Sequence, residues 1–163
     1  MKRSISKILK DCKNELDDIN SIIQRQGPFH KTTPYLIRYS IIRACGTIEV
    51  AFKSIVSDYF NKSKIPQIHN YLDKTVRNNS RNPSYENMCS LLKNFDATWH
   101  AEFKRKIKSH RDKSRLLSSL DSLNLARNEF AHGKVSFTIS INQVINYYDD
   151  TVELLKVMYS CIY

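Results

Sequence analysis

The chain of 163 residues has the length of one domain and can bury most of its apolar surface around a single core. It contains only three glycines and four prolines, which disfavours an all-β fold with many tight turns and favours helices. Its formal net charge of +10 favours polyanionic partners, with nucleic acid ahead of a membrane surface.

The N-terminal third of the chain predicts two long helices. Apolar residues at alternating steps of four and three residues form one narrow stripe on a first helix, which ends at Gly27 and Pro28. The stripe consists of Ile5, Leu9, Cys12, Leu16, Ile19 and Ile23. A second helix is predicted to begin with Thr33 as N-cap and Pro34 at its first position, and to run to about Phe60.

The interior of the second helix, IIRACGTIEVAFKSIV, is apolar on more than one face, which is typical of a central helix with several neighbours. Arg38, Arg43 and Glu49 interrupt this apolar surface. Because desolvating a lone charge is expensive, each of these side chains must be exposed, paired or functional.

Shorter helices are predicted in the middle of the chain. Pro66 begins one that reaches about Val76, and the polar segment RNNSRNPS then forms a loop. Ser84 caps the next helix, and Asp96 caps a further short one.

The last third predicts two more long helices. A leucine-rich helix begins near Lys113, and Gly133 fits a left-handed cap after its C-terminus. Residues 134–139, KVSFTI, are predicted to be an extended connection, and Ser140 with Gln143 forms a capping box for the final helix. The predicted fold is therefore all-α, with one domain over residues 1–163: an antiparallel bundle of about four long helices with short helices inserted in the middle.

Several classes of site and location are disfavoured by the sequence. No stretch approaches the roughly 18 apolar residues of a transmembrane helix, and charges interrupt the apolar positions of the first residues, so we expect a soluble, cytoplasmic protein without a membrane partner. The cysteines form no CxxC pair and the histidines show no HxxxH or HExxH spacing, so neither a metal nor another cofactor is predicted.

Positive charge is concentrated in the segment KRKIKSHRDKSR, which holds seven basic residues and one acidic residue. Such a cluster predicts an RNA-binding surface, although an ordinary solvated surface has the same composition. The residues concerned are Lys104, Arg105, Lys106, Lys108, Arg111, Lys113 and Arg115.

The stretch LARNEFAHGKVSF places polar groups at the end of the leucine-rich helix. Asn128 and His132 are four residues apart and share a helix face, Arg127 flanks them, and Glu129 lies one turn before His132. Arginine binds two phosphate oxygens at once, and histidine exchanges a proton near neutral pH. Cleavage of RNA without a metal needs both groups. Basic residues also suit a helix C-terminus electrostatically, so the residues alone leave a purely structural helix end open.

The sequence RNEFAHG resembles the signature of the HEPN superfamily, in which an arginine and a polar residue precede a histidine, often followed by glycine. The motif on a leucine-rich helix, the short connection and the long final helix fit this resemblance, which is closest to ribonuclease-type HEPN proteins of the RiboL-PSP kind. The resemblance implies an α-helical bundle that dimerises with the two motifs facing each other. It also implies metal-independent cleavage of RNA that leaves a 2′,3′-cyclic phosphate.

Carried over to this chain, the resemblance makes His132 the general acid or base and Arg127 the cation that binds phosphate. Asn128 is then the polar residue that orients them, and Glu49 is the acidic residue that some members place near the site. Cyclising cleavage needs a base and an acid, and a two-fold dimer supplies two histidines.

Three possible functions follow from these observations. The first is a dimeric endoribonuclease, acting as a toxin or antiphage effector and paired with a cognate antitoxin or a nucleotidyltransferase. The second is a HEPN-like module that binds RNA or protein without cleavage. The third is a regulatory domain detached from a nucleotidyltransferase partner.

Overall fold

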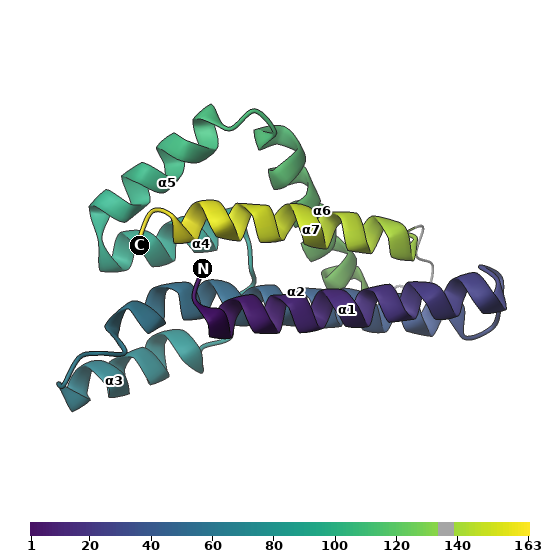
Figure 1. Cartoon of the computed structure of the whole chain (residues 1–163), viewed down its shortest axis with the longest axis horizontal. Helices are drawn as coiled ribbons and strands as arrows, with labels where there is room; N and C mark the ends of the chain where they lie inside the picture. Colours follow the sequence, from purple (N-terminus) through teal and green to yellow (C-terminus); the bar gives the residue numbers. More distant parts are fainter. Residues whose placement is uncertain (134–138) are drawn as a thin grey trace.

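The computed structural model describes residues 1–133 and 139–163, and these residues form helices and connections without a strand (Figure 1). The four long helices are α1 (Arg3–Gln26), α2 (Thr33–Ser57), α6 (Lys113–Ala131) and α7 (Ile141–Tyr159). Between α2 and α6 lie η1 (Asp58–Phe60), α3 (Pro66–Leu72), η2 (Asp73–Arg77), α4 (Tyr85–Phe95) and α5 (Ala97–Ser109). The all-α prediction, with four long helices and short ones inserted in the middle, is confirmed.

The long helices pack around α7, which contacts α1, α2 and α6. In Figure 1, α1 runs antiparallel to both α2 and α7, while α6 is inclined to these three helices. The predicted extended connection lies outside the described residues, except for its last residue, Ile139. None of the helices in the described ranges has the length and apolarity needed to cross a membrane.

The predicted helix ends are largely confirmed, and one of them is wrong. All six residues of the α1 stripe are buried, and α1 ends at Gly27 with a φ of +93°. The N-cap of α2, however, is Thr32 rather than Thr33. Thr33 is buried inside the helix, where its hydroxyl donates to the carbonyl oxygen of Gly27 at 3.2 Å. Its side chain therefore joins α2 to the end of α1 instead of capping α2.

Two predicted helices, the second one and the one that begins at Pro66, end in turns that are not α-helical. The α-helical part of α2 ends at Ser57, and the segment to Phe60 tightens into the 3-10 turn η1. The helix that begins at Pro66 is α-helical only to Leu72 and continues as the π-helical turn η2.

The side-chain caps predicted for α4, α5 and α7 are present. Ser84 Oγ accepts from the backbone N–H of Asn87 at 3.2 Å, and Asp96 Oδ1 accepts from that of Thr98 at 2.6 Å. In the capping box of α7, Ser140 Oγ accepts from the N–H of Gln143 and the Gln143 side chain accepts from the N–H of Ser140. These short polar motifs act over three residues, which is why the sequence predicts them well.

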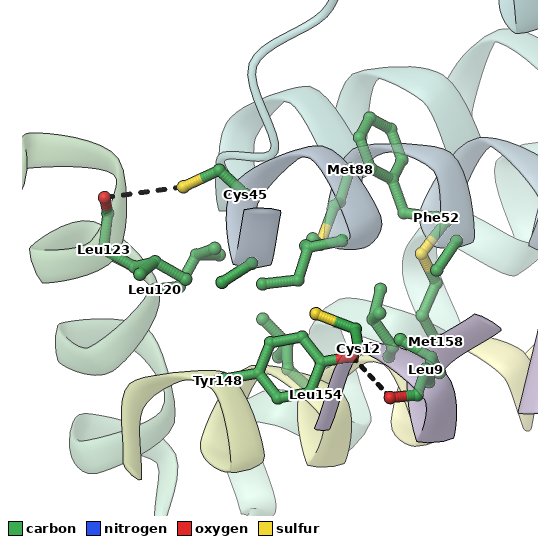
Figure 2. Packing of buried hydrophobic residues seen from close by; sticks show 14 of the residues in the cluster. Leu9, Cys12, Cys45, Phe52, Met88, Leu120, Leu123, Tyr148, Leu154 and Met158 are labelled. Atoms are coloured by element: carbon green, nitrogen blue, oxygen red, sulfur yellow. Dashed lines mark hydrogen bonds between the residues drawn. The ribbon is translucent and has the colours of Figure 1, made fainter. Parts of the chain in front are cut away.

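One cluster of buried side chains includes residues from each α-helix of the described ranges, and Figure 2 shows part of it. The second helix supplies much of it, including Phe52, as expected for a central helix apolar on more than one face. Near the middle of the cluster, the buried hydroxyl of Tyr148 on α7 donates to the carbonyl oxygen of Leu9 on α1 at 2.8 Å. This hydrogen bond joins the first and last helices inside the core.

Replacing Tyr148 with phenylalanine is expected to lower the free energy of unfolding by about 1 kcal/mol, because the ring is kept while the buried hydrogen bond to Leu9 is lost. Urea unfolding followed by circular dichroism measures the change. The control is Tyr71→Phe, since Tyr71 is 60% exposed. Equal stability of the two variants would show that the hydrogen bond contributes no net free energy.

Candidate active site

The end of α6 presents the histidine of the RNEFAHG motif to solvent. The helix ends at Ala131, and the backbone N–H of His132, its C-cap residue, donates to the carbonyl oxygen of Asn128 at 3.0 Å. Gly133 follows with a φ of +77°, which confirms the predicted left-handed conformation. His132 is exposed, and its imidazole makes no hydrogen bond to the parts of the chain that the structure describes. The ring is therefore accessible to a ligand.

The arginine and asparagine of the motif are joined to each other and to a third residue. Arg127 Nη1 donates to Asn128 Oδ1 at 3.3 Å and to Asn82 Oδ1 at 3.4 Å. Arg127, Asn128 and Asn82 are all half-buried. The structure thus places Arg127 and His132 at the same helix end, with the arginine fixed and the histidine open to solvent.

Asn82 belongs to the loop between η2 and α4, residues 78–84, which is anchored to the bundle on both sides of Asn82. The backbone N–H of Arg81 donates to Glu49 Oε1 on α2 at 3.0 Å. The carbonyl oxygen of Pro83 accepts from Asn124 Nδ2 on α6 at 2.9 Å. The sequence predicts only a polar loop here, and nothing in its composition indicates these contacts.

Glu49, the predicted acidic residue, lies under this loop with a basic partner. Its Oε1 also accepts from Lys53 Nζ at 2.6 Å, and the two side chains are 20% and 9% exposed. The carboxylate is therefore both paired with a cation and bonded to the backbone of the loop, which satisfies the requirement for a charge within an apolar helix.

Cys45 lies close to Arg127 and Glu49. Burial raises the pKa of its thiol to about 12. The charge of Arg127 lowers this pKa by a smaller amount, and the charge of Glu49 raises it. The thiol donates to the carbonyl oxygen of Leu123 at 3.6 Å. Because a neutral thiol is a poor nucleophile, Cys45 is a core residue rather than a catalytic one.

A second arginine reaches the end of α6 from α2. The guanidinium carbon of Arg38 lies 5.9 Å from the ring centre of Phe130 and 5.7 Å from that of Tyr35. Phe130 lies inside the motif, so Arg38 adds positive charge beside it. The sequence marks Arg38 as a charge that needs an explanation, but only the structure shows which part of the chain it contacts.

An apolar stripe on the outer side of α2 runs beside these residues. Its members are spaced three or four residues apart, and we call it the α2 stripe: Tyr35, Tyr39, Ile42, Gly46 and Val50. The four large side chains are between 41% and 67% exposed. An ideal Cβ at Gly46 would meet no atom within 4 Å, so another surface can approach closely there. On α6, Leu125 is 60% exposed and lies on the helix face of Asn128.

The basic residues predicted to bind RNA lie far from the motif. They occupy α5, the turn after it and the start of α6, and the 19 residues of α6 separate its ends by about 27 Å. Much of their charge is compensated: Arg105 and Lys106 contact Glu102, Arg111 and Arg115 contact Asp112, and Arg115 also contacts Asp150. The exposed lysines Lys104, Lys108 and Lys113 form no ion pair with the residues that the structure describes.

Within residues 1–133 and 139–163, no three His, Cys, Asp or Glu side chains are grouped so that they could hold a metal ion.

Comparison with known proteins gives one result. A family model described as RiboL-PSP-HEPN matches residues 3–163, almost the whole chain. No curated protein and no solved structure matches the chain.

Proposed function

The chain belongs to the RiboL-PSP-HEPN family, whose model matches residues 3–163, and on this premise we propose that it is a metal-independent endoribonuclease. The family indicates a ribonuclease or RNA-related function. The observation that carries the finer proposal is the end of α6, where an exposed imidazole and an arginine held by amides lie on the last turns of one helix. These groups match the proton transfer and phosphate stabilisation that RNA cleavage requires.

In the proposed reaction, the imidazole of one His132 removes the proton of a ribose 2′-hydroxyl. The 2′ oxygen attacks the adjacent phosphorus, the bond from phosphorus to the 5′ oxygen breaks, and the leaving oxygen takes a proton from a second acid. Arg127 stabilises the negative charge that accumulates on the phosphate oxygens, and Asn128 helps to orient its guanidinium. The products are a 2′,3′-cyclic phosphate and a 5′-hydroxyl.

The second acid is proposed to be His132 of a second copy in a two-fold dimer, because one chain offers a single histidine at this site. The α2 stripe and Leu125 support this arrangement, since their large side chains are exposed. Tyr35 of the stripe lies next to Arg38, which contacts Phe130 of the motif. A homodimer that covers them would bring the two copies of α6 close together.

Contacts to RNA away from the reaction are proposed for the segment Lys104 to Arg115. Three exposed lysines of this segment, which form no ion pair with the described residues, supply charge for phosphate contacts. A role as toxin or antiphage effector, controlled by an antitoxin or a nucleotidyltransferase, fits an enzyme that cleaves cellular RNA.

The experiment is incubation of the purified protein with RNA in the presence of EDTA, followed by analysis of the new ends. New fragments with 2′,3′-cyclic phosphate and 5′-hydroxyl ends are expected. Cleavage that EDTA abolishes, or fragments with other ends, would contradict the mechanism. The net charge of +10 favours one second candidate, an RNA-binding module, for which strongly salt-dependent binding without new ends is the expected result.

A further inference from the structure

We propose that Asn82, on the loop between η2 and α4, is a positioning residue that holds the guanidinium of Arg127 for a phosphate group. This inference rests on the proposed function, because it assigns Arg127 the task of binding a phosphate. Asn82 lies 45 positions before Arg127 in the chain, and only the fold brings the two side chains within 3.4 Å.

The contact leaves the charge of Arg127 available. Within the described residues, five arginines pair with carboxylates: Arg43, Arg77, Arg105, Arg111 and Arg115. Arg127 is bonded instead by the neutral side-chain amides of Asn82 and Asn128. An amide oxygen orients a guanidinium as a carboxylate does, but it adds no negative charge that would repel a phosphate.

The two amides use only part of the guanidinium. Both contacts are made by Nη1, which leaves the N–H groups of Nε and Nη2 for an anion. Arginine loses considerable rotamer freedom when it is fixed. Because the amides hold Arg127 before a substrate binds, the substrate does not have to supply this ordering free energy.

Asn82 can orient Arg127 because its own backbone is fixed from several sides. The neighbouring residues are bonded to Glu49 on α2 and Asn124 on α6, at 3.0 and 2.9 Å. The carbonyl oxygen of Asn82 accepts from Asn87 Nδ2 on α4 at 2.8 Å. Three helices thus hold the backbone from which the Asn82 side chain extends.

Glu49 contributes to this arrangement through the loop. Its carboxylate binds the backbone N–H of Arg81, while Lys53 compensates its negative charge at 2.6 Å. We therefore infer that Glu49 holds the loop that carries Asn82. Because Lys53 pairs with its carboxylate, Glu49 does not neutralise the positive charge of Arg127.

The test uses two substitutions of Asn82 in the full chain, assayed by steady-state cleavage of RNA. Asn82→Ala removes the acceptor, so kcat is expected to fall about 10- to 100-fold with little change in KM. Asn82→Asp keeps an acceptor, but its negative charge compensates that of the Arg127 guanidinium. KM is therefore expected to rise. The slope of RNA affinity against salt concentration is expected to fall by about one phosphate contact. A loss of fold would lower the concentration of active protein, and with it the apparent kcat, in both variants, and would appear in thermal melts.

Asn79→Ala is the matched control, because Asn79 lies in the same loop and is exposed, and its side chain forms one hydrogen bond with the described residues, to the carbonyl oxygen of Thr75 at 3.4 Å. Wild-type kinetics are expected for this control. If Asn82 acts through Arg127, the double variant Asn82→Ala, Arg127→Ala is expected to cleave no more slowly than Arg127→Ala alone. Additive losses, or an Asn82→Ala variant within about 2-fold of wild type, would overturn the assignment.

A second measurement separates this inference from the proposed function. The side-chain Nε–H resonance of Arg127, identified by its loss in Arg127→Ala, is expected to shift in Asn82→Ala and to stay unchanged in Asn79→Ala. If the wild-type protein leaves RNA intact but the resonance shifts, the proposed function is wrong and the positioning contact stands. An unchanged resonance in Asn82→Ala contradicts the positioning role whether or not the protein cleaves RNA.

Discussion

Substitution of His132 by alanine is expected to reduce the rate of RNA cleavage about 10²- to 10⁴-fold, the usual contribution of a general acid or base. Arg127→Ala is expected to cost about 10²- to 10³-fold, because it removes the cation proposed to stabilise the transition state. His132 is exposed, and Arg127 is bonded by neutral amides, so neither change removes a core side chain. Folding and assembly are therefore expected to persist. Single-turnover cleavage measures the rates.

Two substitutions serve as matched controls for this pair. His30→Ala changes another exposed histidine, in the connection between α1 and α2. Arg25→Ala changes an arginine that, like Arg127, lies near the end of a long helix. Both controls are expected to cleave like the wild type. Undiminished cleavage by His132→Ala and Arg127→Ala would refute the proposed mechanism even if the protein remains a ribonuclease.

Substitution of Ile42 by aspartate is expected to convert the proposed dimer into monomers. Ile42 lies near the middle of the α2 stripe and is 41% exposed in the single chain. An unpaired carboxylate buried in an apolar interface costs about 3 kcal/mol or more, which weakens association more than about 100-fold. Sedimentation velocity measures the oligomeric state, and cleavage is expected to fall as the dimer is lost, since each site is proposed to need both copies of His132.

Ile65→Asp is the control for this variant, because Ile65 is 53% exposed and lies just before α3, outside the α2 stripe. It is expected to remain dimeric. A wild-type protein that sediments as a monomer at concentrations where it cleaves RNA would contradict the role of the α2 stripe and the two-histidine mechanism together.

The features that the sequence predicts well depend on residues close together in the chain. The stripe of α1, the caps at Ser84 and Asp96, and the left-handed Gly133 each follow from patterns within a few helical turns. The wrong N-cap at Thr33 has the opposite origin, since its hydroxyl bonds to Gly27 of the preceding helix end. A residue type that suits a cap gives no information about a competing partner outside its own helix.

The residues of the candidate site also differ in whether the sequence predicts them. Arg127, Asn128 and His132 are predicted from one heptapeptide, but Asn82 meets them only through the packing of the loop against α2 and α6. The charge of the segment from Lys104 to Arg115 is likewise reduced by Asp150, which lies on α7 and pairs with Arg115. Partners this distant follow no periodicity, so composition overstates the free charge of the segment.

The hydrogen bonds that hold residues 81–83 to α2 and α6 are directional, which distinguishes them from the apolar contacts of the core. The hydrophobic attraction between apolar side chains has no preferred angle. A hydrogen bond weakens steeply when its angle or length changes. The bonds to Glu49, Arg127 and Asn124 therefore favour the one alignment of the loop in which the Asn82 amide reaches Arg127.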